Sequence, residues 1–188
     1  MDHKGVTYCT VCDGPLFKEK ITATIGAGNA ALESALMMGG IAKKVYLVTK
    51  YPENKHIGFP KGEDILIEKI KELKNIEIIY SANTTEILGT DKVEGLKYEQ
   101  DSESKQIDVQ GVMIHIGMIP NSKFVVCTEK NPPGEIIVDA KCTTSCTGVF
   151  AAGDVTNIAY KQIGIATGQG ITAALSAIDY INRWKSKE

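Results

Sequence analysis

The stretch GAGNAA at residues 26–31 constrains the fold more than any other feature of this chain. It follows the β-branched, apolar run ITATI at 21–25 and leads into AALESALMMGG at 30–40, whose apolar residues recur at helical spacing. In a G-x-G-x-x-A loop the first glycine allows a tight turn, the second lets the backbone approach a pyrophosphate, and the small third residue lets helix pack on strand. The helix N-terminus offers N–H groups and the positive end of its dipole to phosphates. Because strand, loop and helix occur together, we favour a dinucleotide site over a merely structural turn.

The segments after this loop continue the alternation. KVYLVTK at 44–50 and IEIIY at 76–80 are typical of buried strands, and EDILIEKIKEL at 63–73 is an amphipathic helix. Strands that alternate with helices form a parallel sheet through right-handed crossovers. The sequence therefore predicts an α/β, Rossmann-like βαβ unit.

A different pattern follows. Segments 84–89, 93–100 and 105–110 alternate or nearly alternate polar and apolar residues between turn-rich stretches, which predicts an antiparallel meander. Residues 111–117 return as a buried strand, in which we read His115 as an ordinary strand residue. Helix–strand alternation then ends, so we expect a boundary near 117–122 and two domains, 1–117 and 118–188. In the second we expect a strand near 135–138 and a long helix over about 163–184.

Composition narrows the function classes. The net charge is −2 at pH 7, which gives no overall positive field for nucleic acid or an anionic membrane. No apolar run approaches the roughly 20 residues that a membrane span needs. The N-terminal residues MDHKG contain no apolar signal region, so we expect a cytoplasmic protein, where thiols are mostly kept reduced.

Five cysteines stand at positions 9, 12, 127, 142 and 146. The odd count argues against a framework of paired disulfides and for one or two special thiols. In CTVCDG at 9–14, the two-residue spacer brings the sulfurs close enough to bond if the turn is helical, and Asp13 is placed to move a proton. A structural zinc site is the alternative, using Cys9, Cys12, Cys142 and Cys146. We favour redox chemistry over zinc, and zinc over inert cysteines; no metal site is our prediction.

The end of the second strand bears on nucleotide choice. An acid about 20 residues after the loop would favour NAD, and basic groups would favour NADP. Thr49 and Lys50 stand there, with no acid before Glu53, which argues mildly against plain NAD. Lys50, Lys55 and Lys61 offer point charges for a 2′-phosphate, and solvated loop lysines are an equal alternative.

The ordered set CTVCDG, GAGNAALESA and, at 148–155, GVFAAGDV resembles the thioredoxin reductase family of low-molecular-weight, FAD-dependent enzymes. The resemblance covers essentially the whole chain. It implies a pyridine-nucleotide domain with a redox disulfide, followed by the closing segment of an FAD domain. Electrons would pass from NADPH or NADH through FAD to Cys9–Cys12 and on to a thioredoxin- or glutaredoxin-like partner.

The resemblance also implies residue roles. Cys12 would face the flavin in a charge-transfer contact, Cys9 would attack the partner's disulfide, and Asp13 would donate and accept the proton. The cofactor-binding residues it implies are Gly26, Gly28, Asn29, Ala30, Thr49, Lys50 and Gly117 in the first domain and Gly153, Asp154, Lys161, Gln162 and Ile163 in the second.

Two departures from the family pattern matter. The usual His-Arg-Arg run after the second strand is Thr49-Lys50-Tyr51 here, which leaves NADPH and NADH both open. The family's opening strand with its own G-x-G-x-x-G, which binds the ADP part of FAD, has no counterpart before residue 5. We therefore expect half a flavin site, in a fragment, in a truncated product, or in a chain completed by a homodimer or by a separate polypeptide carrying the FAD half.

Two other functions remain open from the residues. One is a catalytically silent, nucleotide-binding module, motivated by the missing FAD cradle. The other is an interaction protein stabilised by zinc on four cysteines.

Overall fold

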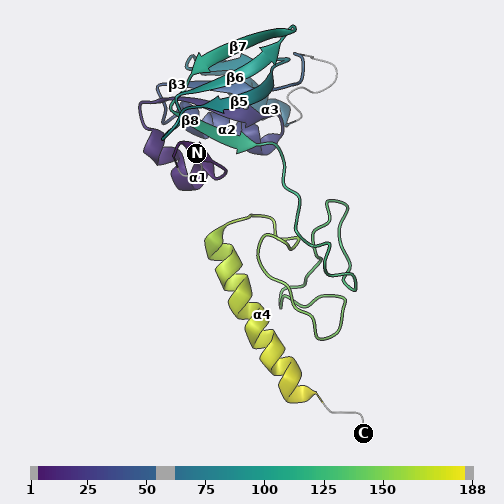
Figure 1. The fold of residues 1–188 in the computed structure, drawn as a ribbon. Coiled ribbons are helices and arrows are strands. Elements are labelled where there is room, and N and C mark those ends of the chain that lie inside the picture. Colours follow the sequence, from purple (N-terminus) through teal and green to yellow (C-terminus); the bar gives the residue numbers. More distant parts are fainter. Residues whose placement is uncertain (1–3, 54–61, 185–188) are drawn as a thin grey trace. The chain divides into compact units, whose positions relative to one another are not determined.

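The computed structural model describes residues 4–53 and 62–184 (Figure 1). The chain forms two compact units, Met1–Gly117 and Met118–Glu188, called unit 1 and unit 2 below. The boundary falls where helix–strand alternation ends in the sequence. Each unit is described by itself.

Unit 1 is built on a parallel sheet. Its strands follow the order β1 (Val6–Thr7), β8 (Gly111–His115), β2 (Ile21–Gly26), β3 (Lys44–Val48) and β4 (Ile76–Ile79), and every neighbouring pair is parallel. Helix α2 (Asn29–Gly39) connects β2 to β3, and α3 (Asp64–Glu72) lies between β3 and β4 in the chain. The predicted parallel α/β sheet is confirmed. Strand β1, of two residues, was not predicted.

A second, antiparallel sheet consists of β5 (Asn83–Leu88), β6 (Gly95–Gln100) and β7 (Glu103–Asp108), in that order. It is the predicted meander. In Figure 1 this sheet and helices α2 and α3 lie on opposite faces of the parallel sheet. Unit 1 therefore has three layers, with a hydrophobic core on each side of the parallel sheet.

Side-chain alternation along β3 shows how one strand serves both cores. Val45 and Leu47 join the core that contains Leu32 and Met38 of α2. Val48 joins the opposite core, with residues of the antiparallel sheet. Successive residues of a strand point to opposite faces, so a strand buried on both sides reads as a continuous apolar run.

Unit 2 contains one described helix, α4 (Ile163–Arg183), close to the predicted 163–184. The predicted strand at 135–138 is wrong: Ile136 makes only isolated bridges, to Lys130 and to Thr156. The backbone N–H groups explain the difference. Those of Ile136 and Ile137 donate to Val155 O and Glu129 O, and that of Val138 donates to the Asn157 side chain. The three N–H groups thus alternate between two segments, residues 155–157 and residue 129, and one of the three bonds goes to a side chain, so only isolated bridges form.

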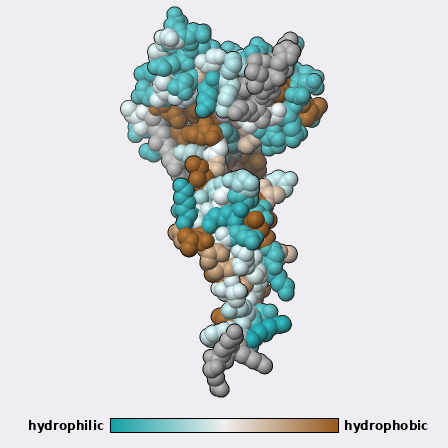
Figure 2. Space-filling model, turned by 90° about the vertical axis from the view of Figure 1, so that its right-hand side faces the viewer, coloured by the Kyte–Doolittle hydropathy of each residue, from teal (hydrophilic) through white to brown (hydrophobic). Residues whose placement is uncertain are grey.

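Helix α4 buries none of its residues. Ile171, Leu175 and Ile178, at i, i+4 and i+7 spacing, are 59%, 62% and 54% exposed. Brown, hydrophobic residues also reach the surface of unit 2 in the view of Figure 2. Among the described residues, no helix combines the length and apolar character needed to cross a bilayer.

Candidate functional site

The two cysteines of CTVCDG are bonded to each other. Cys9 and Cys12 form a disulfide with a Cα–Cα distance of 5.3 Å, on the short helix α1 (Thr10–Asp13). Cys9 is the N-cap of α1, and its sulfur accepts a 3.2 Å hydrogen bond from the Cys12 N–H. Cys9 is half-buried and Cys12 exposed. Backbone donation to the Cys9 sulfur favours negative charge there once the bond is opened.

Asp13, the last residue of α1, is held by a side chain that sequence reasoning missed. The Thr7 hydroxyl donates to Asp13 Oδ2 at 2.5 Å, and the Cys9 N–H donates to Thr7 Oγ1 at 3.2 Å. Thr7 belongs to β1 and is buried. One buried hydroxyl on the parallel sheet therefore orients both the carboxyl and the start of the redox helix. The only sequence signal was its position two residues before Cys9.

Thr10, between the two cysteines, ties α1 to the nucleotide-binding fold. Its hydroxyl lies 2.6 Å from Ser34 Oγ on α2 and 3.0 Å from His115 Nε2 at the end of β8. Burial lowers the pKa of His115 below its ordinary value. His115 is the last residue of β8, as predicted for a strand residue, and it also anchors the helix that carries the disulfide.

The glycine loop joins β2 to α2. Gly26 has φ +150°, and a Cβ there would lie 2.3 Å from the His115 carbonyl oxygen, so only glycine fits. A Cβ on Gly28, the N-cap of α2, would meet no described atom within 4 Å. Within the described part of the chain, no side chain caps this helix end by a hydrogen bond. Open space in front of such a helix N-terminus fits the pyrophosphate of a dinucleotide.

Asn29, the first residue of α2, uses its side chain within the fold. Its Nδ2 donates to Glu63 Oε1 at 3.0 Å, and its Oδ1 accepts from the Glu63 N–H at 2.9 Å. Glu63 is the N-cap of α3. This pair brings a carboxylate to the N-terminus of α2, which sequence reasoning missed. The neighbouring Ala30 is exposed.

The two residues that follow β3 differ in their exposure to solvent. Thr49 is buried, and its hydroxyl accepts from the Tyr51 N–H at 3.2 Å. Lys50 is exposed, with its ammonium 5.6 Å from the centre of the Tyr51 ring. Lys55 and Lys61 lie outside the described residues. Gly117, exposed and at φ +101°, is the last residue of unit 1.

In unit 2, a tight turn surrounds Gly153. Its N–H donates to Gln169 Oε1 of α4 at 2.8 Å, and its carbonyl accepts from the Thr156 hydroxyl at 2.7 Å. Thr156 Oγ1 also lies 3.3 Å from Gln169 Oε1. Gln169 therefore fixes the turn, and Asp154 next to Gly153 stays exposed. Sequence reasoning missed Gln169, whose one signal is a polar residue within an apolar helix.

Lys161, Gln162 and Ile163 form the approach to α4. The Lys161 ammonium bonds to Glu135 Oε1 at 2.8 Å and donates to the Thr156 carbonyl at 2.5 Å. The hydrogen bond from Lys161, followed by that from Asn131, lowers the pKa of Glu135. Gln162 is the N-cap residue of α4, and Ile163 is 84% exposed. The N–H groups of the first turn of α4 are available to bind an anionic or polar group, as at other helix N-termini.

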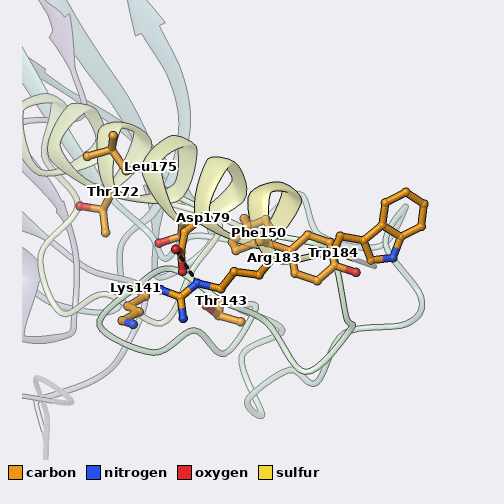
Figure 3. A pocket seen from close by; sticks show the side chains of 10 residues that line it. Lys141, Thr143, Phe150, Thr172, Leu175, Asp179, Arg183 and Trp184 are labelled. Atoms are coloured by element: carbon orange, nitrogen blue, oxygen red, sulfur yellow. Dashed lines mark hydrogen bonds and ion pairs between the residues drawn. The ribbon is translucent and has the colours of Figure 1, made fainter. Parts of the chain in front are cut away.

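A groove runs along the C-terminal half of α4 (Figure 3). Its volume is about 780 Å³, and Phe150 packs edge-on against Tyr180 in it, with ring centres 6.2 Å apart. Asp179 and Arg183 form an ion pair on the helix at 2.8 Å. Trp184 lies at the helix end and is 66% exposed.

The cysteines do not assemble as the zinc alternative requires. Cys146 is bonded to Cys127, and Cys142 is a buried free thiol. Within residues 4–53 and 62–184, no three His, Cys, Asp or Glu side chains are grouped to hold a metal ion. The described structure thus pairs four of the five cysteines, where an odd count had argued against paired disulfides.

Comparison with known proteins places the chain in a family. The family model for pyridine nucleotide-disulphide oxidoreductases matches residues 1–170. An alkyl hydroperoxide reductase subunit of Escherichia coli (strain K12) is 46% identical over 187 residues, covering 97% of this chain and 35% of that protein. A NADH dehydrogenase of Ferdinandcohnia aciditolerans is 45% identical over 184 residues, covering 96% of this chain and 34% of that protein.

The solved thioredoxin reductase from Streptococcus pyogenes MGAS5005 is similar with a TM-score of 0.84 and 30% identity, covering 96% of this chain and 58% of that chain. The chain spans about a third of the length of the curated relatives it matches. It belongs to the pyridine nucleotide-disulphide oxidoreductase family.

Proposed function

We propose that this chain is the part of an NAD(P)H-dependent disulfide reductase that holds the redox disulfide and the nucleotide site. The observation that carries the proposal is the Cys9–Cys12 bond in the same compact unit as the glycine loop. The electron acceptor we propose is a protein disulfide of the thioredoxin or glutaredoxin type.

The family uses FAD and a pyridine nucleotide, which when bound supply the two electrons that reduce the disulfide. Cys9 then attacks one sulfur of the partner's disulfide, a Cys9–partner bond forms, and the partner's second sulfur leaves as a thiolate. Cys12 next attacks Cys9, so the Cys9–Cys12 bond forms again and the partner's first sulfur leaves. The partner gains two electrons and takes up two protons, and the cysteine pair loses two electrons.

Two features support these roles. The Cys12 N–H bond to the Cys9 sulfur stabilises the Cys9 thiolate, as an attacking thiol needs. Asp13, adjacent to Cys12 and held by Thr7, is the proposed proton donor and acceptor.

We propose NADH as the hydride donor. A relative 45% identical to this chain is named a NADH dehydrogenase. The described residues after β3 offer Lys50 and no arginine fork for a 2′-phosphate. Gly26, Gly28, Asn29 and Ala30 would surround the nucleotide phosphates. Thr49, Lys50 and Gly117 are proposed to line the same site.

For FAD we propose contacts from unit 2. Asp154 would accept from hydroxyl groups of the cofactor, and the start of α4 at Gln162 and Ile163 would direct its N–H groups at the ring. Gly153 would permit close approach, and Lys161 would hold the segment in place through Glu135. The remaining flavin contacts would come from a polypeptide that carries the FAD half, or from a second copy of this chain.

A trapping experiment tests the exchange chemistry without flavin. The chain with Cys12→Ser is reduced, freed of reductant and mixed with oxidised thioredoxin and, separately, oxidised glutaredoxin. We expect a stable mixed disulfide on Cys9 with at least one of them, and no mixed disulfide on residues 5–18 in the matched Cys9→Ser variant. Trapping with neither protein would contradict the proposed acceptor class.

Nucleotide titration separates the proposal from a silent binding module. We expect NADH binding by the chain and, after addition of FAD and a polypeptide with the FAD half, NADH-dependent reduction of a disulfide dye that Cys9→Ser and Cys12→Ser abolish. NADH binding with dye reduction that ignores both substitutions would favour the silent module.

A further inference from the structure

Unit 2 contains a second disulfide, between Cys127 and Cys146, which the proposed function does not use. The two residues are 19 apart in the chain, and their Cα atoms lie 5.6 Å apart, within the range that a disulfide spans. We propose that Cys127–Cys146 is a second reversible disulfide, which thiols or dithiols open at Cys127. This inference does not depend on the proposed function of Cys9 and Cys12.

The bond joins an exposed loop to a turn held by hydrogen bonds. Cys127 is exposed, and its neighbours Phe124 and Val126 are 77% and 89% exposed. Cys146 is half-buried in a turn where its N–H donates to Thr144 Oγ1 at 3.2 Å and its carbonyl accepts from the Val149 N–H at 3.0 Å. Because Cys127 is the more exposed residue of the two, its sulfur is the proposed point of attack for an incoming thiolate, and Cys146 is the leaving group.

The fifth cysteine does not compete for either partner. Cys142 is 2% exposed, and its thiol donates to the Gln169 carbonyl at 3.5 Å. Burial, followed by the charge of Asp139, raises the pKa of the Cys142 thiol. A buried, protonated thiol is a poor nucleophile, so the Cys127–Cys146 pairing is protected from exchange with its close neighbour in sequence.

The proposed reaction balances. A thiolate of the reductant attacks the Cys127 sulfur, the Cys127–Cys146 bond breaks, and Cys146 leaves as a thiolate that takes up a proton. A second thiol of the reductant then attacks the reductant sulfur that is bonded to Cys127. The reductant leaves as a disulfide, and Cys127 becomes a thiol. Reoxidation by glutathione disulfide reverses these steps and yields two molecules of glutathione.

When the Cys127–Cys146 bond is open, few hydrogen bonds among the described residues join the loop that contains Cys127 to the turn that contains Cys146. The Glu129 N–H still donates to Ser145 Oγ at 2.7 Å, and Lys130 Nζ still bonds to the Val125 carbonyl within the loop. Residues 123–127 would then be held mainly from within the loop and by the buried Ser122, whose hydroxyl donates to Gly134 O at 2.5 Å. We expect reduction to loosen this apolar loop while the rest of unit 2 keeps its hydrogen bonds.

Peptide mapping tests the pairing. Trypsin cleaves after lysine, which places Cys127 in peptide 124–130, Cys142 and Cys146 in peptide 142–161, and Cys9 and Cys12 in peptide 5–18. The full chain is equilibrated with glutathione disulfide, alkylated and digested. We expect peptide 124–130 linked to 142–161. The link should persist in Cys142→Ser and be lost in Cys146→Ser, which serve as matched variants.

Reversibility is tested on the native chain. Dithiothreitol and, separately, reduced glutathione should open the link without denaturant, and glutathione disulfide should restore it. Proteolysis at Lys123 should become faster on reduction in the wild type and be equally fast, with or without reductant, in Cys127→Ser. Free Cys127 and Cys146 in the oxidised native chain would overturn the proposal. So would a link that opens only after denaturation, or a link that survives in Cys146→Ser.

Discussion

The Thr10 hydroxyl lies 3.0 Å from His115 Nε2 and 2.6 Å from Ser34 Oγ, so one side chain between the two cysteines joins the redox helix to both α2 and β8. Removing a buried, bonded hydroxyl costs about 1–3 kcal/mol, since its partners lose their hydrogen bonds. We expect Thr10→Val to lower the free energy of unfolding by that amount, measured by urea titration, whereas Thr10→Ser should retain most of it. Equal stability of the Val and Ser variants would contradict this role.

His115 makes stability depend on pH. Burial lowers its pKa in the native protein below 6.5, so the unfolded chain binds a proton first as the pH falls. The free energy of unfolding should therefore decrease as the pH falls below 6.5. Above pH 6.5, His115 should cause no change of the free energy of unfolding with pH. His115→Gln keeps a hydrogen-bonding group that does not titrate. The free energy of unfolding of this variant, measured at several pH values, should lose the decrease that His115 causes below pH 6.5. The same slope of free energy against pH as in the wild type would contradict the role of His115.

Asp13 and Thr7 should act as a unit in disulfide exchange. Asp13→Asn removes the proposed proton acceptor, so we expect exchange between the reduced chain and oxidised thioredoxin to slow by about 100-fold, the lower end of general acid–base effects. Thr7→Val should slow it less, because the carboxyl remains but loses its 2.5 Å bond. In stopped-flow measurements, the double variant should match Asp13→Asn. Additive losses would show that Thr7 acts on something else.

The two glycines of the loop should respond differently to one added methyl group. In Gly26→Ala the methyl would meet the His115 carbonyl at a φ of +150°, so we expect a loss of stability of about 1–3 kcal/mol or more. In Gly28→Ala, where φ is −89° and no described neighbour lies within 4 Å, stability should change by less than about 0.5 kcal/mol. NADH affinity, measured by fluorescence titration, should nevertheless fall in Gly28→Ala, because the methyl occupies space in front of the helix. Wild-type affinity in that variant would argue against a phosphate site there.

Glu63 places a negative charge beside the same helix N-terminus. Glu63→Gln can keep the hydrogen bonds to Asn29 and removes the charge. A charge at a helix terminus is worth about 0.3–1 kcal/mol, so NADH affinity should rise about two- to fivefold, with the largest gain at low salt. Weaker binding would instead indicate that the carboxylate bonds the nucleotide directly.

The Lys161–Glu135 pair should stabilise unit 2. Its side chains are 15% and 21% exposed, whereas those of the Lys44–Glu77 pair are 37% and 55% exposed. We expect Lys161→Met to cost about 1–3 kcal/mol and the matched Lys44→Met less than about 1 kcal/mol, by chemical denaturation. Because Lys161 lowers the pKa of Glu135, its contribution should be present above pH 4.5 and decline as the pH falls through the lowered value. Equal losses of unfolding free energy in Lys161→Met and Lys44→Met would contradict the expectation that the more buried ion pair contributes more to stability.

The elements predicted well from sequence are those with a strong period. The βαβ alternation of unit 1 follows from apolar residues such as Val45 and Leu47, which must be buried on a sheet whatever follows them. Strand β1 has two residues and no detectable period. At 135–138, β-prone residues are present, but three consecutive N–H groups divide between residues 155–157 and residue 129, which no local pattern reveals.

Of the candidate site, the sequence predicted the contacts that depend on local spacing and missed those that depend on tertiary structure. Spacing in the sequence brings Cys9 and Cys12 together, because both lie on one turn of helix. Thr7 and Ser34 act through tertiary contacts, and Gln169 reaches Gly153 across 16 residues. The Cys127–Cys146 bond has no spacing signature, and pairing among several cysteines does not follow from sequence.

Helix α4 has a consequence for local opening. No residue of α4 is fully buried, so packing contributes less to this helix than to α2, in which Leu32, Ala35 and Met38 are buried. Gly164, Gly168 and Gly170 weaken its first turns further, because glycine loses more backbone freedom in a helix than other residues do. Its amide protons should therefore exchange with solvent faster than those of α2, and protection of residues 171–178 would report directly on whether another surface has covered this face.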